Sequence, residues 1–126
     1  MKKVYLLFAC ALLLTLTGCK KSVLYPSDSG KTLTYNLGET FSIKLPENPS
    51  TGYSWRFRTK PKSQLIVSQI SDHFEEPKTN RVGVGGEHTF VWQAVNAGEV
   101  EIRGFHMRPW VRSKEEPSVT YKIIVR

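Results

Sequence analysis

At residues 48–55 the sequence reads Asn48-Pro49-Ser50-Thr51-Gly52-Tyr53-Ser54-Trp55, and this stretch joins two segments in which apolar and polar residues alternate. Pro49 fixes its own φ angle and favours an extended Asn48, while Gly52 can adopt the positive φ angle that tight turns often need. We therefore predict a rigid turn that holds Ser50 and Thr51 at its tip, with both hydroxyl groups pointing outward. Taken alone, an Asn-Pro-Gly cluster is usually an ordinary connection between strands, so its role depends on the rest of the chain.

Alternating apolar residues predict β-strands on both sides of this turn. Phe41, Ile43 and Leu45 share one face of the preceding segment, and residues 53–57 repeat the pattern with three aromatic residues. Similar segments cover residues 65–70, 88–95, 100–106 and 119–125. Whether the first of these continues through His73 and Phe74, into the polar and glycine-rich stretch 72–86, is open. About seven short strands without helical periodicity predict an all-β fold, an antiparallel β-sandwich of immunoglobulin-like type.

The start of the chain has the features of an export signal. Lys2 and Lys3 precede an apolar segment, residues 4–16, that is too short for a permanent membrane-spanning helix. The sequence Leu16-Thr17-Gly18-Cys19 then resembles the lipobox of bacterial lipoproteins. We therefore expect residues 1–18 to be a signal peptide, residues 19–30 a lipidated Cys19 with a tether, and residues 31–126 the folded domain. The protein would be anchored to a membrane of the bacterial cell envelope; the alternative is a plain secretory signal with an incidental cysteine.

Charge and cysteine content narrow the possible functions. Removal of residues 1–18 takes away two lysines and no acidic residue, so the net charge falls from +7 to +5. The remaining charges are dispersed, which fits a solubilising surface better than a nucleic-acid site, and we expect no nucleic-acid partner. Of the two cysteines, Cys10 lies in the predicted signal peptide and Cys19 is the predicted lipid attachment site. The mature domain would be a monomer without a disulfide or a thiol nucleophile.

Catalytic and metal-binding patterns are weak in this sequence. Ser50, Thr51 and Ser54 are not in a Gly-x-Ser-x-Gly elbow, and the three histidines are scattered rather than spaced as metal ligands. The glycine-rich stretch Gly83–Gly86 lacks the Lys-Ser/Thr of a phosphate-binding loop. We therefore predict that the protein is not an enzyme and binds no metal or cofactor.

Three unusual turns favour a binding function instead. They are Asn48–Tyr53, Gly83–Gly86 and Arg108–Trp110, and in a seven-strand sandwich the first and third lie at one end. The second can reach the same end if its long connection crosses over. Trp110 follows Pro109 beyond an alternating strand, which predicts an exposed interface residue, although a tryptophan folded back on the core edge is the alternative. Trp55 and Trp92 are in phase with buried neighbours and are predicted to lie in the core.

The three turns together resemble those of the chagasin family of cysteine-peptidase inhibitors, which carries an Asn-Pro-Thr-Thr-Gly-type, a Gly-x-Gly-Gly and an Arg-Pro-Trp-type loop in this order. The corresponding residues are Asn48, Pro49, Ser50, Thr51, Gly52; Gly83, Val84, Gly85, Gly86; and Arg108, Pro109, Trp110. The departure is Ser50, where the family often has threonine. The resemblance implies a reversible, tight-binding inhibitor that occludes the active-site cleft of papain-like cysteine peptidases with three loops and without a cofactor. The alternative is an immunoglobulin-like envelope lipoprotein with a structural or adhesive binding role.

Overall fold

The computed structural model describes residues 21–62, 65–77, 85–111 and 116–126. Within these residues the strands are β1 (Val23–Leu24), β2 (Thr32–Tyr35), β3 (Thr40–Glu47), β4 (Ser54–Lys60), β5 (Val67–Glu75), β6 (Gly86–Ala94), β7 (Gly98–Met107) and β8 (Val119–Val125). Two short 3-10 turns, η3 (Pro26–Asp28) and η4 (Pro49–Thr51), follow β1 and β3. The predicted signal peptide and Cys19 lie outside the described residues. None of the residues that the structure describes forms a helix of the length and apolarity needed to cross a membrane.

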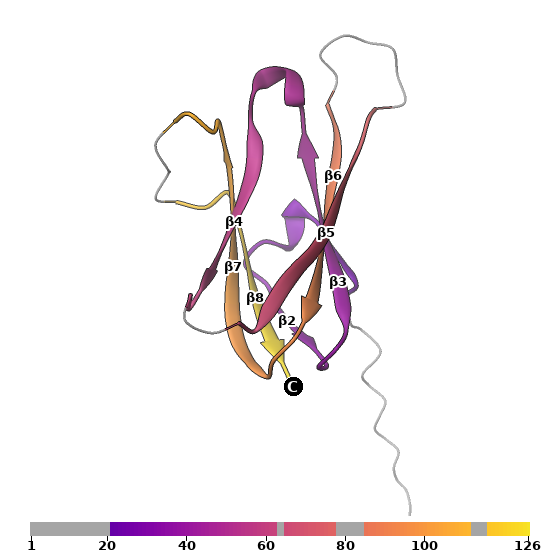
Figure 1. Ribbon diagram of the computed structural model, residues 1–126, viewed down its shortest axis with the longest axis vertical. Helices are drawn as coiled ribbons and strands as arrows, with labels where there is room; N and C mark the ends of the chain where they lie inside the picture. Colours follow the sequence, from indigo (N-terminus) through magenta and orange to yellow (C-terminus); the bar gives the residue numbers. More distant parts are fainter. Residues whose placement is uncertain (1–20, 63–64, 78–84, 112–115) are drawn as a thin grey trace, which may run out of the picture.

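The strands form two four-stranded sheets packed face to face, with strand orders β1-β3-β6-β5 and β2-β8-β7-β4 (Figure 1). The all-β sandwich predicted from the sequence is therefore confirmed. The pairs β1–β3 and β2–β8 are parallel, whereas all other pairs that the structure describes are antiparallel. Parallel pairing is possible at these two edges because the chain changes sheet between β1 and β2, and again between β2 and β3.

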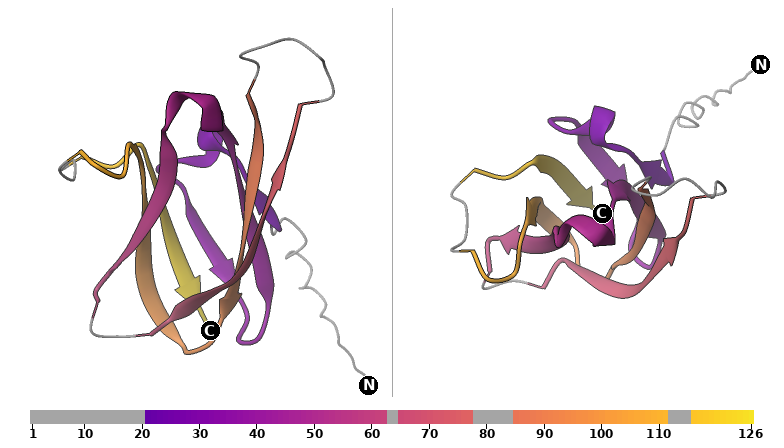
Figure 2. Two further views of the ribbon diagram at one scale, coloured as in Figure 1. Left: turned by 45° about the horizontal axis from the view of Figure 1, so that its top comes forward. Right: turned by 90° about the horizontal axis from the view of Figure 1, so that it is seen from above.

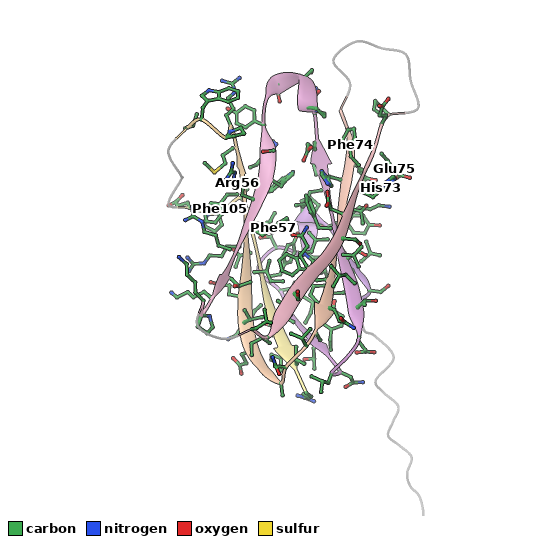
Figure 3. The ribbon with its side chains drawn as sticks, in the orientation of Figure 1. Arg56, Phe57, His73, Phe74, Glu75 and Phe105 are labelled. Atoms are coloured by element: carbon green, nitrogen blue, oxygen red, sulfur yellow. The ribbon has the colours of Figure 1, made fainter. Side chains whose placement is uncertain are left out.

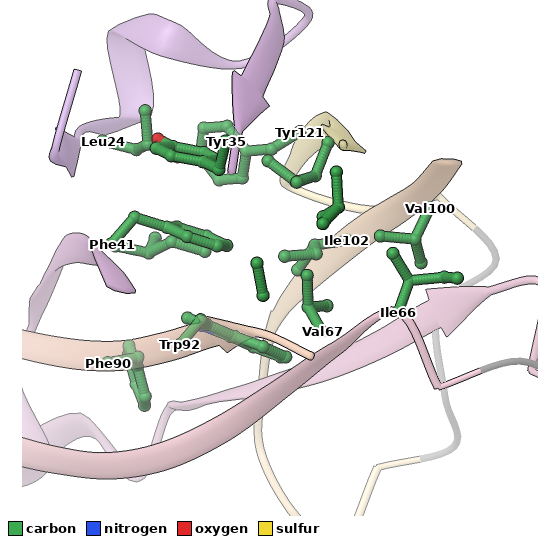
Figure 4. Packing of buried hydrophobic residues seen from close by; sticks show 14 of the residues in the cluster. Leu24, Tyr35, Phe41, Ile66, Val67, Phe90, Trp92, Val100, Ile102 and Tyr121 are labelled. Atoms are coloured by element: carbon green, nitrogen blue, oxygen red, sulfur yellow. The ribbon is translucent and has the colours of Figure 1, made fainter. Parts of the chain in front are cut away.

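Apolar side chains that follow the predicted two-residue periodicity fill the space between the sheets (Figure 4). Phe41 and Trp92 are direct cross-strand partners in one sheet, and both are buried. Phe57 of the other sheet packs edge-on against Trp92, with ring centroids 5.5 Å apart. Arg56, the next residue along β4, points outward to solvent (Figure 3). The core prediction is thus confirmed for Trp92, whereas Trp55 is only partly buried at the edge of the core.

Strand β5 resolves the question that the sequence left open. It runs through His73 and Phe74 to Glu75, so residues 72–75 belong to a strand and not to the polar connection. A bulge between Gln69 and Ser71 interrupts the alternation, which explains why the pattern weakened there. Since β5 is an edge strand, its polar side chains can remain in water while the backbone pairs with β6.

Residues 21–31, most of which were expected to be part of a tether, form a compact N-terminal corner on the domain. Leu24 of β1 is fully buried, and the Asp28 side chain is only 1 % exposed. The Asp28 carboxylate accepts a hydrogen bond from the Tyr25 N–H group at 2.9 Å and lies 3.1 and 3.0 Å from the Lys21 and Lys31 ammonium groups. The Tyr25 N–H hydrogen bond, helped by Lys31 and then by Lys21, lowers the pKa of Asp28 to about 2 against the opposing effect of burial.

Two buried tyrosines complete this corner. The Tyr35 hydroxyl donates a hydrogen bond to the Lys21 carbonyl oxygen, and the Tyr121 hydroxyl donates to the Tyr25 carbonyl oxygen at 2.8 Å. Burial raises the pKa of both hydroxyl groups to about 12, with smaller contributions from the Glu39 and Asp28 charges at Tyr35 and from the Asp28 charge at Tyr121. The segment before β2 is therefore fixed to one sheet by β1–β3 pairing and to the other by the two tyrosine hydroxyls, with Leu24 buried in the core.

Candidate functional site

The described parts of the three turns noted in the sequence lie at the same end of the sandwich, which we call the apical end (Figures 1 and 2). The β3–β4 loop covers residues 48–53, the β5–β6 loop residues 76–85, and the β7–β8 loop residues 108–118. Strand direction explains this placement, because β3, β5 and β7 all end where β4, β6 and β8 begin. Gly83 and Val84 lie outside the described residues, whereas the other ten predicted loop residues are described.

The β3–β4 loop is held in shape by hydrogen bonds within itself. The Asn48 side-chain oxygen accepts hydrogen bonds from the Ser50 N–H group at 3.2 Å and from the Ser50 hydroxyl at 2.7 Å. The Thr51 hydroxyl donates to the Asn48 carbonyl oxygen, also at 2.7 Å. Gly52 has a φ angle of 83°, the conformation for which glycine was expected. Ser50 and Thr51 are exposed at the tip, but the prediction that their hydroxyl groups point outward is wrong, because both bond to Asn48.

The carbonyl groups of this loop are also engaged within the protein. The Asn48 carbonyl accepts from the Thr51 N–H group at 3.1 Å, and the Pro49 carbonyl accepts from the Gly52 N–H group at 3.0 Å. The Thr51 carbonyl accepts from the Arg108 guanidinium Nε at 3.2 Å. The loop is therefore a closed helical turn and not an extended strand.

The β7–β8 loop braces the β3–β4 loop from one side. Besides bonding to the Thr51 carbonyl, the Arg108 guanidinium lies 4.7 Å from the centre of the Tyr53 ring and 6.0 Å from that of the Trp110 ring. The Trp110 ring covers Gly52 so closely that a Cβ atom there would lie 2.8 Å from Trp110 Cη2. Trp110 is nevertheless 72 % exposed, so the predicted exposed position is confirmed.

The end of the β5–β6 loop braces the same turn from the other side. A Cβ atom at Gly85 would lie 3.1 Å from both the Asn48 Cβ and the Glu47 carbonyl oxygen. At Gly86 a Cβ atom would clash with the Glu75 carbonyl oxygen and the Phe74 ring. Close approach within the protein therefore requires a glycine at position 86 and leaves little room for a side chain at position 85, whatever the two residues contact outside the protein.

Next to the loops, His88 of β6 and His106 of β7 make contacts that join neighbouring strands, and the sequence did not indicate a site for either histidine. His88 Nδ1 lies 3.1 Å from Glu47 Oε1, and His88 Nε2 lies 2.6 Å from Asp72 Oδ2, which links β6 to β3 and β5. The His106 ring stacks on Trp55 with ring centroids 4.6 Å apart. In the part of the chain that the structure describes, no group of three or more acidic, histidine or cysteine residues is arranged to hold a metal ion. These contacts join residues far apart in sequence, and only the strand register could have revealed them.

Comparison with known proteins gives a consistent result. A sequence model of the chagasin family of peptidase inhibitors matches residues 34–125. Chagasin of Trypanosoma cruzi is 33 % identical over 84 residues, which cover 65 % of this chain and 76 % of chagasin. Amoebiasin-1 of Entamoeba histolytica is 27 % identical over 99 residues, covering 79 % and 94 % of the two chains. The crystal structure of a cysteine protease inhibitor from Entamoeba histolytica superposes with a TM-score of 0.72 at 25 % identity, covering 85 % of this chain and 96 % of the inhibitor.

Proposed function

The chain belongs to the chagasin family of peptidase inhibitors, and we propose that it inhibits papain-like cysteine peptidases reversibly by laying its apical loops across the active-site cleft. The matching family and the known relatives consist of inhibitors and not of enzymes. This agrees with the prediction that the chain has no catalytic activity. They do not favour the alternative of an adhesive envelope protein.

The proposed mechanism rests on one observation: the apical loops contact one another and are ordered before any peptidase binds. Arg108 and Trp110 hold the β3–β4 turn from one side and Gly85 holds it from the other. Loops that are already ordered lose little conformational entropy on docking, so more of the contact free energy becomes affinity. The exposed tip of the turn and the exposed Trp110 ring supply polar and aromatic contact surface at one end of a rigid sandwich.

Each loop has a distinct place in this arrangement. Residues Asn48–Gly52 would enter the centre of the cleft, with Ser50 and Thr51 near the catalytic cysteine–histidine pair. Residues Gly83–Gly86 would line one flank. The other flank would be held by Arg108–Trp110, with the Trp110 ring packed on an aromatic surface of the peptidase.

The shape of the central loop also explains how an inhibitor of this kind avoids cleavage. Peptidases that bind their substrate as an extended strand pair with its backbone groups. In the β3–β4 turn the carbonyl groups of Asn48, Pro49 and Thr51 already accept hydrogen bonds within the protein. Presenting the loop as an extended substrate would break these bonds and pull Gly52 away from the Trp110 ring.

Papain and a fluorogenic peptide substrate provide the test. The purified full-length protein should inhibit papain in competition with the substrate, and activity should return on dilution. Mass spectrometry after long incubation should find the inhibitor intact. Rapid cleavage within residues 48–53, or no inhibition of several papain-like peptidases at micromolar protein, would contradict the proposal and leave the adhesive role as the better explanation.

We also propose that the protein is a monomeric lipoprotein of the bacterial cell envelope. The support is the basic start of the chain, its short apolar segment and the box Leu16–Cys19. Lipidation should produce a mature chain that begins at an acylated Cys19 and partitions into detergent. A Cys19→Ser variant that is still cut after Gly18 and still bound to membranes would refute the anchor.

A further inference from the structure

The structure leaves almost no free chain between the proposed lipid and the folded domain. The backbone is fixed from Lys21 onward, because the Lys21 carbonyl accepts the Tyr35 hydroxyl and the Ser22 carbonyl accepts the Ser42 N–H group at 2.8 Å. Only Lys20 separates Cys19 from this fixed point, and the two fully extended Cα–Cα steps from Cys19 to Lys21 span at most about 7 Å. A lipid on Cys19 would therefore hold the domain against the bilayer and not above it on a tether.

Strand register shows which end of the domain would face the lipid. Val23 pairs in parallel with Ser42, near the start of β3, and the residues before Val23 lead back towards Thr40. β3 starts at the turn of residues 36–39 and finishes at the apical loops. The chain thus enters at the end opposite the apical loops, which we call the basal end and which also carries residues 61–62, 65–66 and 95–97 (Figures 1 and 2).

The basal end carries side chains suited to a membrane surface. Leu37 is 57 % exposed and Leu65 is 63 % exposed, each within a connection between strands. Single exposed leucines are common, and it is their placement beside the chain entry that distinguishes these two. The Leu37 turn is rigid, because the Leu37 N–H group donates to the Arg126 carbonyl at 2.9 Å and the Gly38 N–H group donates to the Ala94 carbonyl at 2.8 Å.

Charges at the basal end support the same orientation. Lys60, Lys62 and Arg126 are exposed there. The glutamates of β7 in this region have basic partners, since Glu99 lies 3.7 Å from Lys122 and Glu101 lies 2.8 Å from Arg103. The exposed cations can therefore face anionic phospholipid headgroups, which attract basic residues held close to the surface.

We propose that the basal end docks on the phospholipid bilayer, with Leu37 and Leu65 in the headgroup region and the apical loops directed away from the membrane. This orientation rests on the proposed lipid anchor and is independent of the peptidase target. The ten residues of β7 span about 33 Å, so the loops stand roughly that far from the lipid surface. A peptidase could then reach all three loops without contacting the bilayer.

Site-specific fluorescence can test this orientation. The full chain, expressed with its leader and purified in detergent, would be inserted into vesicles of phosphatidylethanolamine and phosphatidylglycerol. Residues 1–18 carry Cys10 away and the lipid blocks Cys19, so one introduced cysteine is the only thiol to be labelled with a polarity-sensitive dye. The basal variants are Leu37→Cys and Leu65→Cys; the controls are Ile70→Cys, equally apolar but on the side of β5, and Ser50→Cys at the apical end.

The basal labels should shift to shorter emission wavelength and be quenched several-fold more by nitroxide-bearing phospholipids than the labels at positions 70 and 50. Aqueous iodide should give the reverse order. Equal lipid quenching at all four positions, in protein that floats with the vesicles, would overturn the docked orientation while leaving the anchor intact. Protein that does not float would refute both anchor and orientation, and papain inhibition by the Leu37→Cys and Leu65→Cys proteins in detergent reports separately on the inhibitory function.

Discussion

The apical end and the N-terminal corner of this domain are both irregular, and both are held by hydrogen bonds between side chains and backbone. At the apical end these bonds stay within and between the loops, and the tip residues Pro49, Ser50 and Thr51 remain exposed. In the corner the central acceptor, the Asp28 carboxylate, is buried and its donors converge on it from three sides.

The difference shows that the same kind of bond can serve two purposes. Solvent competes for the bonds of an exposed loop, so they contribute little to folding but restrict the loop to one shape. A buried carboxylate that loses its donors has no water to replace them, so its bonds contribute to the stability of the whole domain. Changes at the apical end should therefore alter affinity, and changes in the corner should alter stability.

Trp110→Ala should give the largest effect on binding. An exposed aromatic anchor that packs on the partner contributes about 2–4 kcal/mol, so inhibition of papain should weaken roughly thirty- to nearly thousand-fold, mainly through faster dissociation. The melting temperature should hardly change, since the ring is mostly exposed. Trp110→Phe should recover part of the affinity. A Trp110→Ala protein that melts far earlier but inhibits normally when folded would show that the residue is structural.

Asp28→Ala should give the converse result. One pKa unit corresponds to about 1.4 kcal/mol, so the drop from 3.8 to about 2 indicates that ionisation of Asp28 contributes about 2 kcal/mol of stability. Denaturant unfolding should show a loss of this size, whereas the folded variant should inhibit papain as the wild type does. Asp28→Asn keeps an oxygen acceptor for the Tyr25 N–H group and should be less destabilised. Loss of inhibition without loss of stability would contradict the division between the two regions.

Acid should weaken the corner in a defined pH window. The pKa of Asp28 is lower in the folded state than its unfolded value near 4, so protonation favours unfolding. Its contribution is complete above about pH 4 and should be lost as the pH falls towards 2, up to about 2 kcal/mol. The stability difference between wild type and Asp28→Asn should shrink over this range. A difference that stays constant from pH 5 to about 2 would show that the carboxylate is not the titrating group.

Thr51→Val should have the smallest effect. It removes the hydroxyl that bonds to the Asn48 carbonyl but keeps the shape of the side chain, so the exposed turn loses part of its order. A single hydrogen bond of this kind contributes about 0.5–1 kcal/mol, which predicts inhibition weakened roughly two- to five-fold without a change in melting temperature. Thr51→Ser should inhibit like the wild type. Equal loss in Thr51→Ser and Thr51→Val would point to the methyl group as the contact.

Sequence patterns revealed the parts of this fold that are set locally. The alternation of apolar and polar residues predicted the core strands, and β8 occupies the predicted residues 119–125. The Pro49 and Gly52 signals located the central turn, because each residue restricts or frees its own backbone. The direction of the Ser50 and Thr51 hydroxyls was missed, since it depends on Asn48 turning its oxygens back into the loop.

The features that the sequence did not reveal depend on contacts between distant segments. β1 has two residues, too few for a period, and is recognisable only by its pairing with β3. The stretch around Asp28 is rich in serine, proline and glycine, and this composition indicated a loop. The position of Asp28 three residues after Tyr25 was nevertheless a local signal for a turn in which the carboxylate accepts a backbone hydrogen bond. Trp55 follows the alternation of apolar and polar residues in β4 but lies at the edge of the core, where its indole N–H group donates to the Pro46 carbonyl at 2.9 Å.

Hydrogen–deuterium exchange, measured on the full chain alone and saturated with papain, tests most directly whether the apical end is the inhibitory surface. Bound papain should slow exchange in peptides covering residues 48–53, 85–86 and 108–111, and should leave residues 21–31 and the turn at 36–39 unchanged. Slowed exchange in the N-terminal corner, or no slowing at the apical loops in the presence of saturating papain, would contradict the account.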